Sequence, residues 1–175
     1  MTDDELIEGV RGRLPAGAPP PASEEEVSAA ERQLGFRLQP LLRRLYREVG
    51  NGGWGPEYGA SGLITGARPD LPDSGSVNWV LGMRQAEPDP DAPNPWPGWP
   101  DGLVPVSTWG CAIWSCVDCT SPEGPVIRFD PNAEGAFVDD PWKAVWLPES
   151  PSLRAWLIDW LEDRLPFEMK APDLH

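Results

Sequence analysis

The chain has 175 residues, of which 40% are hydrophobic and ten are tryptophans, and its formal net charge is −14. Its length suits a single domain, and its apolar content excludes disorder throughout the chain. A surface this acidic would repel phosphate backbones, so no nucleic-acid partner is expected. The same charge would steer a basic protein toward the chain, or it could serve solubility alone.

The N-terminus does not resemble a targeting signal. Its first residues, Met1-Thr2-Asp3-Asp4-Glu5, have neither the positive charge nor the apolar run of a signal peptide. No stretch reaches the roughly 18 apolar residues of a membrane span. The three cysteines are an odd number, unsuited to a disulfide framework. We therefore expect a cytoplasmic protein with reduced thiols and no membrane partner.

Three helices are predicted in the first 50 residues. Thr2 and Ser23 each begin a capping box, in which the hydroxyl and a carboxylate three residues later satisfy free amides at the helix start. Between these two helices, residues 15–21 hold four prolines and must form a connector. Gly35 is placed to end the second helix in a left-handed conformation, and Pro40 can open the third.

Short extended segments separated by turns are predicted after residue 54. The better candidates are β-branched or aromatic and are bounded by glycine, proline or aspartate: 103–106, 111–117 and 126–129. Weaker candidates are 62–64, 77–80, 137–138 and 145–147.

A final helix is predicted near the C-terminus. Ser150 can cap it and Pro151 can open it, and the apolar residues that follow recur on one face: Leu153, Trp156, Leu157, Trp160 and Leu161. Helices, then strands, then a helix predict a single α+β domain, with a mostly antiparallel sheet flanked by N-terminal helices and a C-terminal helix.

Two blocks of short motifs carry a family resemblance. The first block is Glu31-x-x-Leu34-Gly35-x-x-Leu38, Leu42-x-x-Leu45-Tyr46 and Gly50-Asn51-Gly52-Gly53. The second is Trp99-Pro100-x-Gly102-Leu103-x-Pro105, Trp109-Gly110-Cys111, Pro125-Val126 and Phe129-Asp130. In this order the motifs resemble the SUKH superfamily, which includes fungal Smi/Knr-type cell-wall regulators and many bacterial immunity proteins. One departure is Leu38-Gln39-Pro40, where the family usually has proline directly after the leucine.

The resemblance implies a sheet flanked by helices, no catalytic residues and the binding of protein partners. Its bacterial members commonly neutralise a toxin, often a nuclease, within polymorphic toxin systems. We therefore expect an N-terminal helix and connector over 1–22, a SUKH-like domain over 23–165 and a tail over 166–175. The alternative is a regulatory or scaffolding adaptor without a toxin partner.

The sequence offers few candidate catalytic residues. Its only histidine is the last residue, His175, so a catalytic triad or dyad that uses histidine would depend on the chain terminus. No phosphate-binding loop or dinucleotide fingerprint is present, so neither an enzyme nor a cofactor is expected. The competing hypothesis is a zinc-binding module using Cys111, Cys116 and Cys119. Zinc takes four ligands, and alternation along a strand would point Cys111 and Cys116 to opposite faces. Buried thiols that act as small hydrophobes are therefore favoured over a metal site.

Candidate partner contacts are aromatic side chains near glycine- or proline-rich loops and aspartates at strand ends or in loops. They are Trp54, Tyr58, Trp96, Asp118, Asp130, Asp139 and Asp140. Together they would make an acidic, aromatic-bearing surface on the sheet side that grips a basic toxin domain. Each has a structural alternative: the aromatic rings could be loop packing, and the aspartates a solvated rim. Trp99, which belongs to the second motif block, is expected to be buried.

Overall fold

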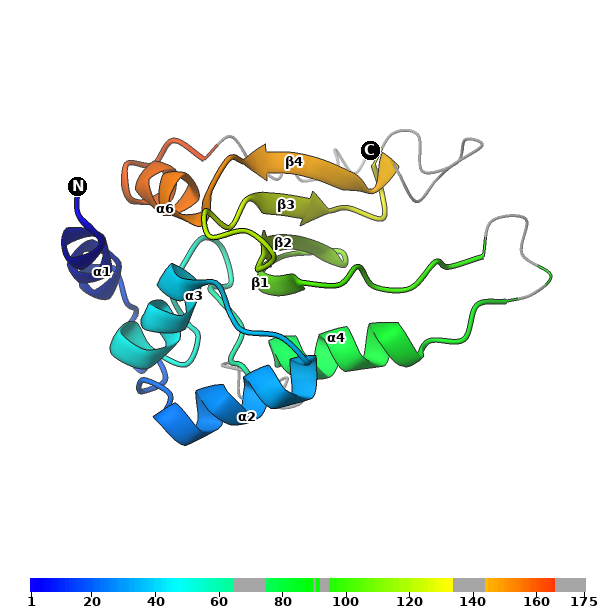
Figure 1. The fold of residues 1–175 in the computed structure, drawn as a ribbon. Coiled ribbons are helices and arrows are strands. Elements are labelled where there is room, and N and C mark those ends of the chain that lie inside the picture. Colours follow the sequence, from blue (N-terminus) through cyan, green and yellow to red (C-terminus); the bar gives the residue numbers. More distant parts are fainter. Residues whose placement is uncertain (65–74, 90, 92–94, 134–143, 166–175) are drawn as a thin grey trace.

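A four-stranded antiparallel sheet organises the part of the chain that the computed structural model describes, residues 1–64, 75–89, 91, 95–133 and 144–165 (Figure 1). The strands follow one another in chain order across the sheet: β1 (Leu103–Gly110), β2 (Ile113–Asp118), β3 (Val126–Phe129) and β4 (Trp146–Ser150). The helical elements are α1 (Asp3–Gly12), α2 (Glu24–Leu34), α3 (Pro40–Arg44), the π-helical turn η1 (Leu45–Val49), α4 (Ser76–Gln85) and α6 (Leu153–Leu161). The predicted α+β class with an antiparallel sheet is confirmed.

The N-terminal helices begin and end where the sequence predicts. The Thr2 and Ser23 hydroxyls each accept the backbone N–H three residues on, at 3.2 Å, and the Glu5 and Glu26 carboxylates close both capping boxes. Gly35 ends α2 with φ 85°, a left-handed conformation that glycine adopts without strain. Pro40 opens α3 as its first residue, which needs no N–H donor there.

Three predictions about the second half are wrong. Residues 77–80 belong to α4, because Val77 and Val80 are buried on one helical face beside β1 and this packing overrides their preference for strands. Residues 62–64 form no strand; the Gly62 and Leu63 carbonyls instead accept the first N–H groups of α4. Ser152, rather than Ser150, caps α6, so Leu153 replaces Pro151 as its first residue. Residues 137–138 lie outside the described residues.

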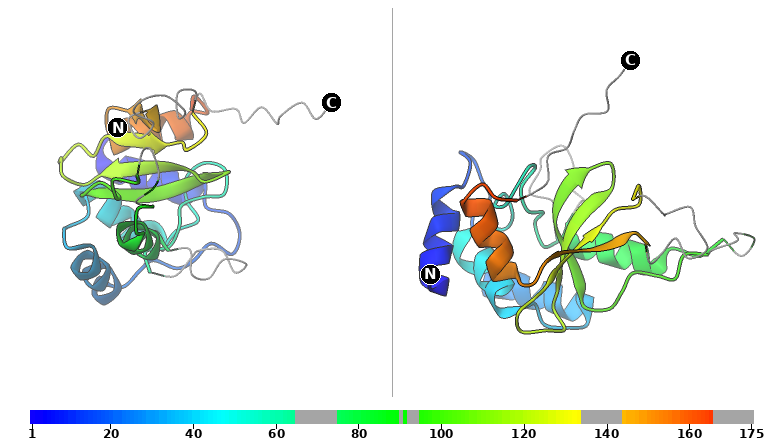
Figure 2. Two further views of the ribbon diagram at one scale, coloured as in Figure 1. Left: turned by 90° about the vertical axis from the view of Figure 1, so that its right-hand side faces the viewer. Right: turned by 90° about the horizontal axis from the view of Figure 1, so that it is seen from above.

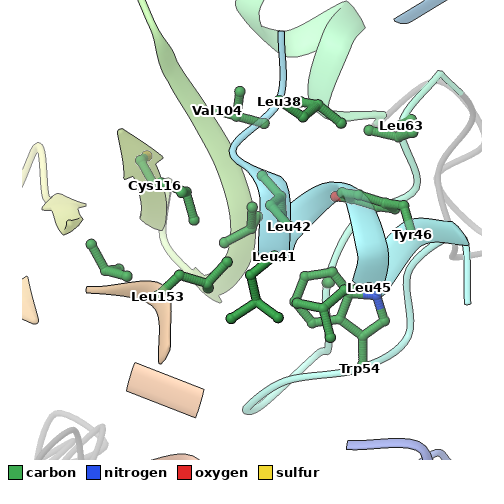
Figure 3. Close-up of a cluster of buried hydrophobic side chains, with 14 of the residues drawn as sticks. Leu38, Leu41, Leu42, Leu45, Tyr46, Trp54, Leu63, Val104, Cys116 and Leu153 are labelled. Atoms are coloured by element: carbon green, nitrogen blue, oxygen red, sulfur yellow. The ribbon is translucent and has the colours of Figure 1, made fainter. Parts of the chain in front are cut away.

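Helices and sheet share one hydrophobic core. Side chains of α3 and η1, including Leu41, Leu42 and Leu45, are buried with Trp54 and Cys116, as Figure 3 shows. The helix α1 joins the same core through Leu6, Ile7 and Val10. It lies beside α6 at one end of the sheet (Figure 2). Arg13, which follows α1, donates to the Trp160 and Leu161 carbonyls at the end of α6, at 3.0 and 2.7 Å. None of the described helices has the length and apolar character needed to cross a bilayer.

Candidate functional site

Trp54 does not belong to an accessible site. Its side chain is fully buried, its indole N–H donates to the Gly50 carbonyl at 3.1 Å, and its ring packs edge-on against Tyr46 at 5.5 Å. An indole without exposed surface cannot contact a partner unless its loop unfolds. Of the sequence alternatives for Trp54, packing is therefore correct.

Tyr58 has the opposite environment, although it lies only four residues further on. Its side chain is 52% exposed, and it is the one aromatic residue among the described residues that is classed as exposed. It projects from a loop that the Gly53 N–H closes by donating to the Ala60 carbonyl at 2.7 Å. Exposed aromatic side chains with little conformational freedom are frequent anchors of protein interfaces.

The backbone around Tyr58 is tightly specified. Glu57 has φ 51°, which is uncommon for a residue with a side chain. Gly59 has φ 73°, and a Cβ there would lie 3.0 Å from the Gly53 carbonyl carbon. The loop also contacts edge strand β1, through a bridge between Ala60 and Ser107. Strained, over-determined backbone of this kind is concentrated at functional sites.

A hollow of about 340 Å³ adjoins Tyr58. Its walls are the proline-rich connector after α1 and the glycines of the Tyr58 loop, and Arg13 borders it. The Arg13 guanidinium donates to the α6 carbonyls, and its hydrogen bond to the Asp163 carboxylate at 2.8 Å raises its pKa. We call Tyr58 and this hollow the Tyr58 site.

Trp96 is half-buried and held in place. Its indole N–H donates to the Met83 carbonyl at 3.1 Å, and its ring meets Phe129 edge-on at 6.3 Å. Phe129 also contacts Trp99, which is 4% exposed, so the predicted burial of Trp99 is confirmed. Trp96 therefore fastens the proline-rich segment before β1 to the aromatic end of the core, and only part of its ring reaches the surface.

The predicted acidic residues do not form one cluster. Asp118 ends β2 and Asp130 follows β3, and the antiparallel register places them at opposite ends of this strand pair. Each carboxylate accepts a local turn N–H, from Thr120 at 2.8 Å and from Asn132 at 2.9 Å. Asp139 and Asp140 lie outside the described residues.

The three cysteines have different environments. Cys111 is exposed in the β1–β2 turn, whereas burial raises the pKa of the Cys116 thiol well above its usual range and that of Cys119 to about 12. Metal ligation requires the thiolate, which these two environments disfavour. Within the described ranges, no three histidine, cysteine or carboxylate side chains gather closely enough to hold a metal. His175 is outside those ranges.

Sequence reasoning overlooked a group of arginines around the turn after α2. Arg32, Arg37, Arg43, Arg44 and Arg47 lie within or near α2, α3 and η1, in a chain that is otherwise strongly acidic. Their close spacing in the sequence was a visible signal, but the net charge of the whole chain concealed it.

The molecule is thus a helix-flanked α+β domain whose candidate site, at Tyr58, is on the surface rather than in an enclosed pocket. A family model described as SMI1 / KNR4 family (SUKH-1) matches residues 21–159. The chain belongs to this family, as the motifs around Gly35 and Trp99 suggest. No curated protein matches the chain in sequence. The matched region begins in the connector, so α1 precedes it.

Proposed function

We propose that the chain is a non-catalytic protein-binding module of the immunity type, which binds and neutralises a toxin, and that the Tyr58 site anchors the partner. The observation that carries this proposal is the exposure of Tyr58 on a closed, strained loop beside a hollow. Membership of the SMI1 / KNR4 family supports a protein partner.

The loop geometry favours a preformed interface. Because the Gly53–Ala60 hydrogen bond and the bridge to β1 already hold the loop, little further conformational entropy is lost when a partner binds. The tyrosine ring can then supply apolar contact area while its hydroxyl meets a polar group of the partner.

Charge supports a basic partner. The net charge of −14 would accelerate the association of a positively charged protein, such as a nuclease toxin with a basic cleft. Glu57, exposed beside Tyr58, places a carboxylate next to the anchor. In this proposal Asp118, Asp130, Asp139 and Asp140 steer the partner by their charge rather than grip it as a single patch.

The test takes as candidate partner a toxin-like domain sought among the genes that neighbour the gene of this chain. It is co-expressed with wild type, Tyr58→Ala or Leu147→Ala, and the affinity of each purified pair is measured by calorimetry. Leu147 is the matched control, because it is also a large exposed apolar side chain but lies on β4. We expect a complex and growth rescue for wild type and Leu147→Ala. Tyr58→Ala should bind about 30-fold more weakly, as an interface hot spot does.

Two results would contradict this proposal in different ways. A tight complex that Tyr58→Ala leaves unchanged would remove the anchor but keep the immunity role. The absence of any complex between wild type and the toxin would favour the regulatory or scaffolding adaptor.

A further inference from the structure

Three neighbouring hollows surround the turn that joins α2 to α3. Their volumes are about 460, 570 and 420 Å³, and Arg37 lines all three. Their described lining residues include six arginines and four carboxylates, a net charge of +2 on a chain whose total charge is −14. We call this the arginine surface; its arginines are Arg32, Arg37, Arg43, Arg44, Arg47 and Arg84.

Most of these arginines are already bound within the chain. Arg44 pairs with Glu48 at 2.7 Å and with Asp4 at 2.8 Å. Arg84 donates to the Leu34 carbonyl at 2.9 Å and to Asp101 at the same distance. Such pairs hold the walls of the hollows in place, and they leave little charge for a ligand.

Arg37 and Arg32 differ from the others. The Arg37 side chain is 85% exposed, and its nearest carboxylate, that of Glu31, is 3.9 Å away. Glu31 is already engaged, because it accepts the Leu38 N–H at 3.0 Å and lies 3.4 Å from Arg43. Arg32 is exposed on the last turn of α2, and no hydrogen bond or ion pair joins it to another described residue. Among the described residues, Arg37 therefore has only a long ion pair with a carboxylate that is already engaged, and Arg32 has no ion pair.

The turn that presents Arg37 is held on both sides. Gly35 ends α2 in the left-handed region, and Leu38 is anchored by its burial and by the bond to Glu31. Phe36 lies half-buried beneath the Arg84 guanidinium, 5.8 Å from ring centre to charge. A fixed backbone reduces the entropy that a ligand must overcome, and the guanidinium fork matches the two oxygens of a carboxylate.

We propose that the arginine surface docks an acidic segment of a protein partner, with Arg37 and Arg32 receiving its carboxylates and an apolar side chain resting beside Phe36. This inference does not rest on the proposed function, since none of these residues lines the Tyr58 site. A nucleic acid fits less well, because phosphate backbones need a continuous basic surface, and four carboxylates interrupt this one.

The test measures the binding of a fluorescein-labelled peptide of repeated Glu-Leu-Glu-Glu units by fluorescence anisotropy at low salt. A matched peptide carries glutamine in place of glutamate. The variant is Arg32→Gln/Arg37→Gln, which changes two exposed side chains. Its control is Arg11→Gln/Arg164→Gln, which removes the same charge from arginines outside the surface. Thermal unfolding verifies that both variants are folded.

We expect wild type and the control variant to bind the acidic peptide with the same affinity, and neither should bind the glutamine peptide. Arg32→Gln/Arg37→Gln should bind the acidic peptide about tenfold more weakly, which corresponds to about 1.4 kcal/mol. The proposal is overturned if wild type does not bind the peptide, or if both double variants weaken binding equally. Tighter, arginine-dependent binding of labelled oligothymidine would replace it with a phosphate-binding surface. The Tyr58→Ala experiment is independent of all these outcomes.

Discussion

The Ser115 hydroxyl on β2 donates to the carboxylate of Glu149 on β4, at 2.8 and 3.0 Å from its two oxygens, across the intervening strand β3. Two indoles extend this contact: Trp109 donates to the Ser115 hydroxyl at 2.7 Å, and Trp156 of α6 donates to Glu149 at 2.8 Å. Arg128 on β3 lies 3.6 Å from the same carboxylate, whose side chain is 3% exposed. A buried polar network therefore joins all four strands of the sheet to the last helix.

Removing the Glu149 carboxylate should destabilise the fold strongly. Glu149→Ala removes a buried carboxylate that lies 3.6 Å from Arg128 and leaves the Ser115 hydroxyl and the Trp156 indole without their acceptor, so the free energy of unfolding should fall by about 3 kcal/mol or more. Urea denaturation measures the change. The exposed residue Glu87 provides the control, since Glu87→Ala should change stability by less than about 0.5 kcal/mol. Similar small effects for both variants would mean that the network contributes nothing net.

The β1–β2 turn is strained, and relieving it should stabilise the protein. Gly110 pairs with Ile113, so Cys111 and Ala112 form a two-residue hairpin loop, with φ 49° and 63°. Turns with two positive φ values favour Asn-Gly. Cys111→Asn/Ala112→Gly should therefore raise the free energy of unfolding by about 1 kcal/mol, measured by thermal unfolding. Cys111→Ser is the control and should change little, because it keeps the strained alanine. A lower midpoint for the double variant would be incompatible with this account.

The N-terminal helices could be predicted well from the sequence, because the residues that start and stop them lie in the first and last turns of the helices themselves. Thr2, Ser23, Gly35 and Pro40 each satisfy or release backbone groups of their own element, so no tertiary information is needed. Ser150 and Ser152 show the limit of this reasoning: both can cap a helix, and β4 continues through Ser150, leaving Ser152 as the cap.

The candidate site was less predictable, because exposure depends on packing between distant segments. Trp54 and Tyr58 flank the same glycines, yet only Trp54 meets Tyr46 and the core. The composition of residues 77–80 similarly favours a strand, and only their packing beside β1 shows that they belong to a helix. The sequence shows that an aromatic residue is present in a loop, but the fold decides which way it points.

Burial of two of the cysteines should make the thiols react at very different rates. Cys111 is exposed, so a thiol reagent such as Ellman's should modify it quickly near neutral pH. Cys116 is buried and should react only as the protein unfolds, whereas the partly buried Cys119 should react slowly, because burial raises the pKa of both thiols. Counting the modified groups with and without urea tests this prediction, and Cys111→Ser should abolish the fast phase. More than one fast thiol in the native wild type would contradict it.

Ionisation of Cys116 and Cys119 should lower the free energy of unfolding at high pH. Their folded-state pKa values are raised, so in the folded protein they remain protonated at a pH where the unfolded chain has already ionised. Their contribution to stability is therefore complete below the unfolded thiol pKa and is lost as pH rises toward the folded value, which is about 12 for Cys119. Urea midpoints should decline less steeply at alkaline pH in Cys116→Ala/Cys119→Ala than in wild type. Parallel declines would show that other groups dominate.

The two capping boxes should make stability fall in acid. Hydrogen bonds from the Thr2 and Ser23 backbones lower the pKa of Glu5 and Glu26 below their ordinary values. A lowered folded pKa gives stability that is present above the unfolded glutamate pKa and is lost as pH falls through the folded one. Glu26→Gln keeps an acceptor but not the titration, so its urea midpoint should depend less on pH below about 5 than that of wild type. Ser23→Ala, which removes the hydroxyl cap, should instead cost about 1 kcal/mol at neutral pH. If Glu26→Gln retained the full acid dependence, the loss would belong to the other carboxylates with lowered pKa values, including Glu24 and Glu48, which pair with arginines.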